Sequence, residues 1–162
     1  MTPDVSELER QARGRLSPEI YDFYAGGAGR EATLRANPLA WEQVQFLPHV
    51  LRDVSAVDTG VQLASPLGLR LRTPVAVAPV AFQQLAHPGG EVASAAGAAR
   101  AGALYVLSTR CSCRIEDVGA AVAAAGGSWW FQVYLMRDRE LTAGLVRRAA
   151  AAGAAALVLT VD

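Results

Sequence analysis

The stretch of sequence that decides the fold is Ala154-Ala155-Ala156-Leu157-Val158-Leu159-Thr160-Val161-Asp162. It is a short and almost wholly apolar run after a helical pattern that ends at Gly153, so we interpret it as a buried parallel strand. The run turns polar at Thr160 and Asp162, which indicates a functional site at its end. A parallel strand needs paired neighbours and a crossover helix. We therefore expect a larger α/β enzyme, of which this chain forms about half of a barrel.

The same pattern recurs upstream of this stretch. Strands are predicted over 75–78, 104–107 and 130–134, and the segments 89–101, 114–125 and 138–152 between the strands have helical periodicity. Successive strands begin about 25 to 30 residues apart, which is the size of one βα unit. This alternation predicts a parallel sheet with right-handed crossovers.

Two architectures share this alternation, an open doubly wound sheet and a (β/α)8 TIM barrel. A dinucleotide-binding open sheet has a glycine-rich phosphate turn after its first strand. The first strand here continues instead into Ala78-Pro79-Val80-Ala81-Phe82-Gln83, without the G-x-G-x-x-G pattern. This absence favours the barrel, and the fold class predicted is α/β, the N-terminal half of a TIM barrel with four parallel strands.

The region before the strands is predicted to be helical. Helices are expected over 5–14, from Ser17 and Pro18 to Gly26, and over 30–45, where Pro38 can kink the helix. Residues 61–63 and 69–71 flank Ser65-Pro66-Leu67-Gly68, a β-hairpin pattern. We therefore divide an incomplete domain, 1–162, into a helical extension (1–60), a hairpin (61–73) and the first four barrel strands (74–162).

Composition excludes several function classes. The fifteen basic and fifteen acidic residues balance, so the net charge gives no reason to expect a nucleic acid or membrane partner. No apolar run reaches the roughly 18 residues of a membrane span, and the polar, acidic N-terminus does not resemble a signal peptide. Cys111 and Cys113 are too few for a metal site and fit a reducing compartment, so we expect a cytoplasmic protein.

Polar side chains follow the predicted strands. In a barrel, the carboxyl ends of all strands face one site. Gln132 and Tyr134 lie two residues apart and so share one face of their strand. Contact with water explains any single polar strand end, but the whole set in so apolar a chain predicts a site for a heterocycle edge and a small polar substrate. The set is Ser108, Thr109, Arg110, Gln132, Tyr134, Thr160 and Asp162.

Five motifs occur in order along the chain and together resemble one family, the FMN-dependent α-hydroxy-acid dehydrogenases and oxidases. This family includes glycolate oxidase, lactate oxidase, mandelate dehydrogenase and hydroxymandelate oxidase. The resemblance runs from about residue 5 to the end. The motifs are Tyr21-Asp22-Phe23-Tyr24-Ala25-Gly26-Gly27-Ala28-Gly29, Val77-Ala78-Pro79-Val80-Ala81, His87-Pro88-Gly89-Gly90-Glu91, Phe131-Gln132-Val133-Tyr134 and Leu159-Thr160-Val161-Asp162.

The resemblance implies an FMN site at the strand ends. The backbone of 79–81 would lie against the flavin near its N5 atom, although many relatives have a threonine in place of Val80. Ser108 would lie near the flavin ring, and Gln132 and Thr160 would hydrogen-bond its pyrimidine edge. The implied cofactor-binding residues are Pro79, Val80, Ala81, Ser108, Gln132 and Thr160.

The resemblance also implies the catalytic and substrate-binding residues. Tyr24 would bind the substrate carboxylate, Tyr134 would lie near the substrate hydroxyl, and Asp162 would orient the catalytic histidine. Neither His49 nor His87 matches that histidine. We expect His49 to be a surface or packing residue and His87 to brace a turn.

The resemblance implies an activity for the complete enzyme. A small 2-hydroxy acid would be oxidised to the 2-keto acid by hydride transfer to flavin N5, in an enzyme that is a homo-oligomer like its relatives. The 162-residue chain alone is expected to be inactive, because it lacks the family's histidine, arginine and phosphate-binding residues. Alternatives are a truncated non-catalytic product, a half-barrel that needs a partner half, and another FMN barrel such as type 2 isopentenyl-diphosphate isomerase.

Overall fold

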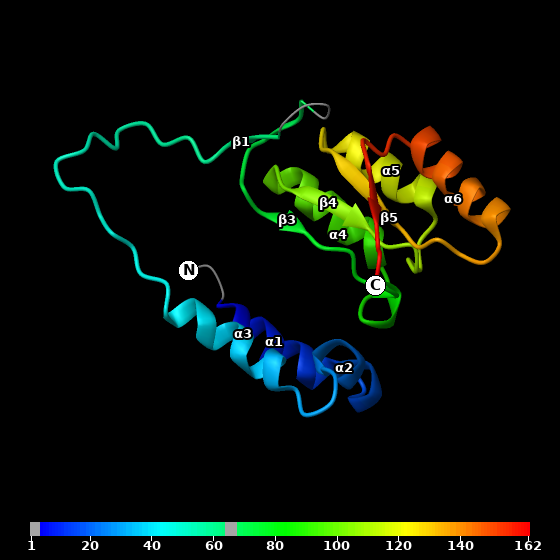
Figure 1. The fold of residues 1–162 in the computed structure, drawn as a ribbon, viewed down its shortest axis with the longest axis horizontal. Helices are drawn as coiled ribbons and strands as arrows, with labels where there is room; N and C mark the ends of the chain where they lie inside the picture. Colours follow the sequence, from blue (N-terminus) through cyan, green and yellow to red (C-terminus); the bar gives the residue numbers. More distant parts are fainter. Residues whose placement is uncertain (1–3, 64–67) are drawn as a thin grey trace. The chain divides into compact units, whose positions relative to one another are not determined.

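The computed structural model describes residues 4–63 and 68–162. The chain forms two compact units, Met1–Val57 and Asp58–Asp162 (Figure 1). Within the described residues, none of the helices combines the length and the apolar character that crossing a membrane requires.

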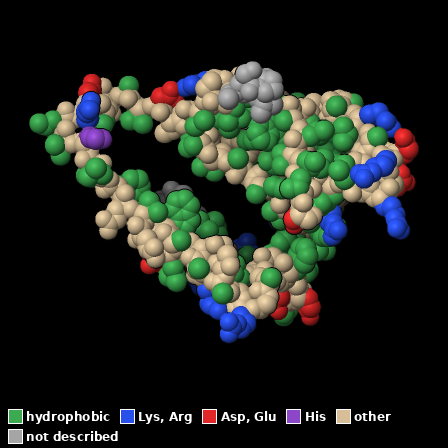
Figure 2. Space-filling view, viewed as in Figure 1, with side chains coloured by type: hydrophobic (Ala, Val, Ile, Leu, Met, Phe, Trp, Pro, Cys, Tyr) green, Lys and Arg blue, Asp and Glu red, His purple; other side chains and the backbone are tan. Residues whose placement is uncertain are grey.

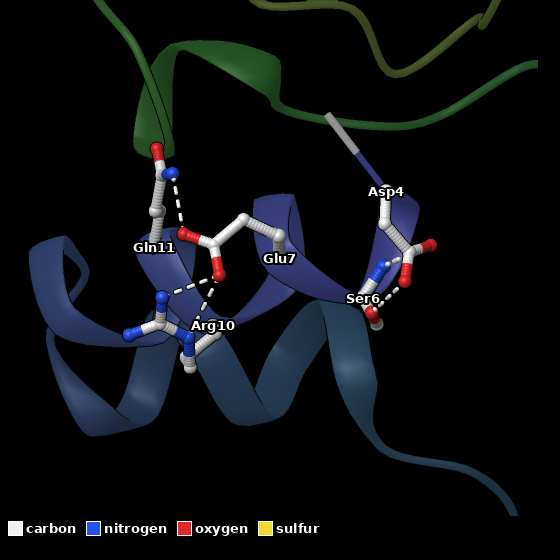
Figure 3. Close-up of polar contacts among 5 residues, drawn as sticks. All are labelled: Asp4, Ser6, Glu7, Arg10 and Gln11. Carbon is white, nitrogen blue, oxygen red and sulfur yellow. Dashed lines mark hydrogen bonds and ion pairs between the residues drawn. The ribbon is translucent and has the colours of Figure 1, made fainter. Parts of the chain in front are cut away.

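The first unit contains three helices, α1 (Val5–Arg15), α2 (Pro18–Ala25) and α3 (Ala32–Glu42). Asp4 caps α1 by accepting from the Ser6 backbone N–H, and Glu7 in the first turn binds Arg10 and Gln11 (Figure 3). The Tyr21 hydroxyl on α2 donates to the Glu9 carboxylate on α1 at 2.9 Å. None of the three helices contains a buried residue, so polar contacts rather than a core join α1 and α2.

The helices of this unit differ from the sequence prediction in detail. The helix α3 is shorter than the predicted 30–45 and runs through Pro38 without a break. It ends where the Val44 N–H donates to the Trp41 carbonyl, a tighter turn than an α-helix makes. Gly26 does end α2, but with a φ of −75°, so this end does not need the left-handed backbone that glycine provides.

The second unit begins with a two-stranded antiparallel hairpin. Its strands β1 (Val61–Gln62) and β2 (Arg70–Leu71) pair Val61 with Leu71 and Gln62 with Arg70. This pairing agrees with the predicted hairpin, although residues 65–67 of the predicted turn lie outside the described residues.

A four-stranded parallel sheet follows the hairpin. The strands β3 (Ala76–Val77), β4 (Leu104–Leu107), β5 (Trp129–Val133) and β6 (Leu157–Leu159) lie in chain order. The helices α4 (Gly90–Ala101), α5 (Ile115–Ala124) and α6 (Arg139–Ala151) connect them, as predicted (Figure 1). A short 3-10 helix, η1 (Gln83–Leu85), lies between β3 and α4 and was not predicted.

The sheet has two different faces, because successive side chains of a strand point in opposite directions. Tyr105, Leu107, Phe131 and Val133 pack with residues of the helices in the main core. Leu104 and Val106 form a smaller cluster on the opposite face, together with Leu71 of the hairpin. Ser108 and Gln132 have the same parity as this second set, so the strands direct them away from the helices.

The terminal strand β6 is less buried than the sequence predicted. Leu157 and Leu159 are 49% and 48% exposed. The register pairs them with Phe131 and Val133, which places them on the helix-bearing face. Among the described strands, β6 pairs only with β5, and this edge leaves both leucines open to solvent. Figure 2 shows hydrophobic side chains at the surface of both units.

Candidate functional site

Three polar residues meet at the carboxyl ends of β4, β5 and β6. The Gln132 side-chain Nε2 donates to the Thr160 hydroxyl at 2.7 Å, and its Oε1 accepts from the Ser108 hydroxyl at 3.5 Å. The strand register explains this meeting, because Val106 pairs with Trp130 and Gln132 pairs with Val158. Continuing the first pairing by two residues brings Ser108 beside Gln132, and Thr160 lies two residues beyond Val158, just after β6.

Thr109 fixes the Gln132 side chain in place. Its backbone N–H donates to the Gln132 Oε1 at 3.0 Å, and its hydroxyl donates to the Gln132 carbonyl at 2.5 Å. Gln132 is 3% exposed, so its amide is a buried polar group with its acceptor oxygen and one donor already bonded. These bonds fix the orientation of the amide, which therefore presents its second N–H group in a defined direction. The sequence prediction included Thr109 among the strand ends but gave it no role.

The loop after β3 is joined to the same end of the sheet. The Phe82 backbone N–H donates to the Arg110 carbonyl at 3.0 Å, which links the β3–α4 loop to the β4–α5 loop. The Arg110 guanidinium carbon lies 5.8 Å from the centroid of the Tyr134 ring, a cation–π contact that links the second loop to the end of β5. Residues from three successive strand ends are thus brought together around Arg110.

A buried carboxylate accepts hydrogen bonds from both the β3–α4 loop and the β4–α5 loop. Glu91, at the start of α4, is 0% exposed. It accepts hydrogen bonds from the backbone N–H groups of Gln83 at 3.0 Å, Ser112 at 2.9 Å and Cys113 at 3.1 Å, and from the Ser112 hydroxyl. Burial by itself raises the pKa of Glu91, but the N–H groups of Ser112 and Gln83 outweigh it and lower the pKa below its ordinary value. The carboxylate is therefore ionised at neutral pH.

Glu91 is the most important residue that sequence reasoning did not assign. It lies within one of the quoted motifs, but no role was predicted for it. The available signal was a carboxylate in the first turn of a helix made mostly of small apolar residues. That signal predicts a charge at a helix N-terminus. It does not indicate that the N–H groups of two loops converge on this carboxylate.

The remaining predicted residues lie in different surroundings. Val80 is 40% exposed beside Pro79, and Tyr134 is also 40% exposed. Asp162 follows β6 and is exposed. Tyr24 belongs to the first unit, on α2, where its ring makes an edge contact with Phe23 at a centroid distance of 5.0 Å. The meeting of Tyr24 with the strand ends stays a prediction.

The two histidines agree with the minor roles predicted for them. His49 is exposed, and the Nδ1 atom of His87 accepts from the Gly89 backbone N–H at 3.0 Å, which braces the turn before α4. Cys111 and Cys113 are free, and burial raises the pKa of the Cys111 thiol to about 11. No group of His, Cys, Asp and Glu side chains able to hold a metal occurs among residues 4–63 and 68–162.

The fold and this site define a class of protein, a parallel βα fold with polar side chains gathered at the carboxyl ends of its strands. The family model described as FMN-dependent dehydrogenase matches residues 12–162. The chain therefore belongs to the FMN-dependent dehydrogenase family, and FMN is the cofactor of that family.

Curated relatives support this assignment. The chain is 47% identical over 158 residues to a 4-hydroxymandelate oxidase from Amycolatopsis orientalis, a match that covers 98% of this chain and 42% of the relative. It is 46% identical over 153 residues to an L-lactate oxidase from Alicycliphilus denitrificans, covering 91% of this chain and 40% of that protein. Glycolate oxidase 3 from Oryza sativa subsp. indica is 40% identical over 159 residues, covering 98% of this chain and 42% of the oxidase.

Solved structures agree with the sequence relatives. A crystal structure of mandelate oxidase superposes on the whole chain with a TM-score of 0.88 at 46% identity, and the match covers 45% of that structure. The complex of mandelate oxidase with (S)-4-hydroxymandelic acid matches 97% of this chain and 42% of its own chain, with a TM-score of 0.86. These structures are TIM-barrel oxidases, so the four parallel strands form part of a (β/α)8 barrel. The chain spans about two-fifths of the length of the curated relatives it matches.

Proposed function

We propose that the protein containing this chain uses FMN to oxidise a small 2-hydroxy acid to the corresponding 2-keto acid. The observation that carries this proposal is the hydrogen-bonded set of Ser108, Gln132 and Thr160 at the strand ends. The names of the relatives support the substrate class, because they are oxidases of hydroxymandelate, lactate and glycolate.

The chemistry of these residues fits the flavin. The pyrimidine edge of a flavin carries carbonyl acceptors and an N–H donor, so it needs partners of both kinds. Gln132 retains a second N–H on its Nε2 atom, and the Ser108 and Thr160 hydroxyls can both donate and accept. The segment Pro79, Val80 and Ala81 has no long polar side chain and allows a close approach to its backbone. FMN, when bound, supplies the acceptor for the hydride equivalent.

The substrate would be held by residues of this chain together with others from the complete protein. We propose that Tyr24 binds the substrate carboxylate and that Tyr134 lies near the substrate hydroxyl. Asp162 would orient a histidine base, which is neither His49 nor His87. Arg110, beside Tyr134, would add a positive charge near an anionic substrate.

Replacing Gln132 with leucine is expected to abolish contact between FMN and the strand ends. The leucine has a similar size but cannot donate to or accept from the flavin edge. The measurement is an NMR titration of the chain with FMN, following the amide shifts of 79–82, 108–110 and 132–134. We expect weak, saturable shifts in the unmodified chain and none of them in Gln132→Leu.

The matched control is Gln62→Leu in β1, where the same exchange is made at an exposed position of the hairpin. It should leave the FMN-dependent shifts unchanged. Shifts in Gln132→Leu equal to those in the unmodified chain would contradict the assignment of Gln132 to the flavin edge.

We also predict that the 162-residue chain alone does not oxidise 2-hydroxy acids and does not hold FMN tightly. Its two histidines, His49 and His87, do not match the family's base, and its sequence contains no lysine. The test is anaerobic bleaching of the flavin absorbance by glycolate, lactate or mandelate, with intact 4-hydroxymandelate oxidase as the positive control. Bleaching by the chain at a rate above that of free FMN would refute this prediction.

We further propose that the complete enzyme is a cytoplasmic homo-oligomer. The two free cysteines support a reducing compartment. The oligomeric state rests on the family resemblance and can be measured by light scattering of the complete protein.

A further inference from the structure

The Gln83 side chain makes three hydrogen bonds at the base of the β3–α4 loop. Its Nε2 donates to the Tyr105 hydroxyl at 3.1 Å and to the Val80 carbonyl at 3.4 Å. Its Oε1 accepts from the Ser94 hydroxyl at 2.6 Å. The amide thus uses both of its N–H groups and its oxygen to join the loop to β4 and α4.

The partners of Gln83 are rigid parts of the fold. Tyr105 is 1% exposed in the centre of β4, and Ser94 lies on α4. The Gln83 backbone N–H is held separately, by the buried carboxylate of Glu91 at 3.0 Å. The side-chain amide and the backbone N–H of Gln83 are therefore both bonded to β4 or α4 of the second unit.

The loop that Gln83 holds has a strained backbone. Phe82 has a φ of 56°, in the left-handed region that is unfavourable for a bulky side chain. Strained residues persist only where the surrounding structure fixes them, and they gather at functional sites. The preceding strand β3 is only two residues long, so the sheet itself gives 79–82 little support.

We propose that Gln83 is a positioning residue that holds the backbone of 79–82 in the conformation that meets the flavin. That the loop meets the flavin rests on the proposed function. That Gln83 holds the loop rests on its hydrogen bonds to Val80, Tyr105 and Ser94. Gln83 would act through the Val80 carbonyl and the Phe82 backbone, and it would not touch the substrate. Its loss should loosen the loop while the sheet behind it remains intact.

The test replaces Gln83 with leucine and, separately, Tyr105 with phenylalanine, which removes only the hydroxyl. Amide hydrogen exchange is measured by NMR in the chain without flavin. We expect exchange of the Phe82 and Gln83 amides to rise about tenfold in Gln83→Leu, the effect of losing roughly one net hydrogen bond. The rise in Tyr105→Phe should be smaller, because only one of the three side-chain bonds is lost. Exchange in β4 and β5 should remain within about twofold of the unmodified chain.

The matched control is Gln84→Leu, the same substitution one residue further along. Among the described residues, the Gln84 side chain makes one long hydrogen bond, in which it donates to the Pro88 carbonyl at 3.4 Å. It should leave exchange at Phe82 unchanged. Unchanged exchange at Phe82 and Gln83 in Gln83→Leu would overturn the proposal. An equal rise in the loop, β4 and β5 would also overturn it, because it would show only a loss of global stability.

An FMN titration of the same variants separates this inference from the proposed function. We expect FMN to shift the amides of 79–82 in the unmodified chain and to shift them less than half as much in Gln83→Leu. If FMN shifts no strand-end amide in the unmodified chain, the proposed function fails, while the exchange result still decides whether Gln83 tethers the loop. Equal FMN shifts in Gln83→Leu and the unmodified chain would overturn the positioning role toward the flavin.

Discussion

Replacing Glu91 with alanine is expected to lower the free energy of unfolding by about 3–5 kcal/mol. The carboxylate accepts from the backbone N–H groups of Gln83, Ser112 and Cys113. Without it, these donors remain buried with no partner, and each unsatisfied donor costs about 1–3 kcal/mol. Urea unfolding followed by circular dichroism measures the loss.

The isosteric variant Glu91→Gln should lose less, about 2–3 kcal/mol, because it keeps the shape and one acceptor oxygen but loses the charge. The matched control is Glu140→Ala, which removes an exposed carboxylate from the first turn of α6. That change should cost less than about 1 kcal/mol. If Glu91→Ala and Glu140→Ala had the same unfolding midpoint, the carboxylate would not be holding the two loops.

The effect of Glu91 should depend on pH in a defined direction. Its pKa in the folded chain is lowered, so its stabilising contribution is complete above the ordinary value of 4.5 and declines as the pH falls through the folded pKa. The difference in unfolding free energy between the unmodified chain and Glu91→Gln should therefore be constant near neutral pH and shrink below about pH 4. A difference that grew on acidification would contradict the lowered pKa.

Replacing Gly119 with alanine is expected to destabilise the chain by about 2–3 kcal/mol, although alanine is the better helix former. Gly119 is buried within α5, and a Cβ there would collide with the carbonyl oxygen of Ala152 and lie 3.1 Å from the Ala152 Cβ. A backbone carbonyl cannot rotate away as a side chain can, so α5 and the end of α6 must move apart. The measurement is again the urea midpoint.

The control for this prediction is Gly144→Ala, which makes the same exchange in the interior of α6. A Cβ at Gly144 meets no atom within 4 Å. There the gain in helix propensity is unopposed, and we expect about 0.5–1 kcal/mol of added stability. The two changes should have opposite signs, and a stabilising Gly119→Ala would show that the contact between α5 and Ala152 is not tight.

Much of the second unit was predictable from the sequence, because its signals are local and repeated. The strand over 104–107 has the predicted bounds, and α6 differs from the predicted 138–152 by one residue at each end. Periodicity of 2 for strands and 3.6 for helices reports which side chains are buried within one element. The polar residues after the strands could likewise be placed at one edge, because parallel strands end on the same side.

The exposed leucines of β6 and the role of Glu91 could not be predicted in this way. Leu157 and Leu159 are as apolar as a buried strand requires, and their exposure depends on which helices cover that face. The contacts of Glu91 depend on residues 8 and 21 positions away in the chain, Gln83 and Ser112. No period within one helix or strand encodes such a distance.

The sequence by itself thus determined the alternating βα order, the parallel sheet and the side of that sheet on which Ser108, Gln132 and Thr160 lie, since these follow from periodicity and strand direction. The tertiary structure alone decided that the Gln132 amide bridges Ser108 and Thr160, that Glu91 binds two loops and that the Gln83 side chain holds the strained one of these two, the β3–α4 loop. The physical reason is that a hydrogen bond needs two groups within about 3.5 Å in the right orientation. Only the packing of strands and loops brings residues so far apart in the chain to that distance.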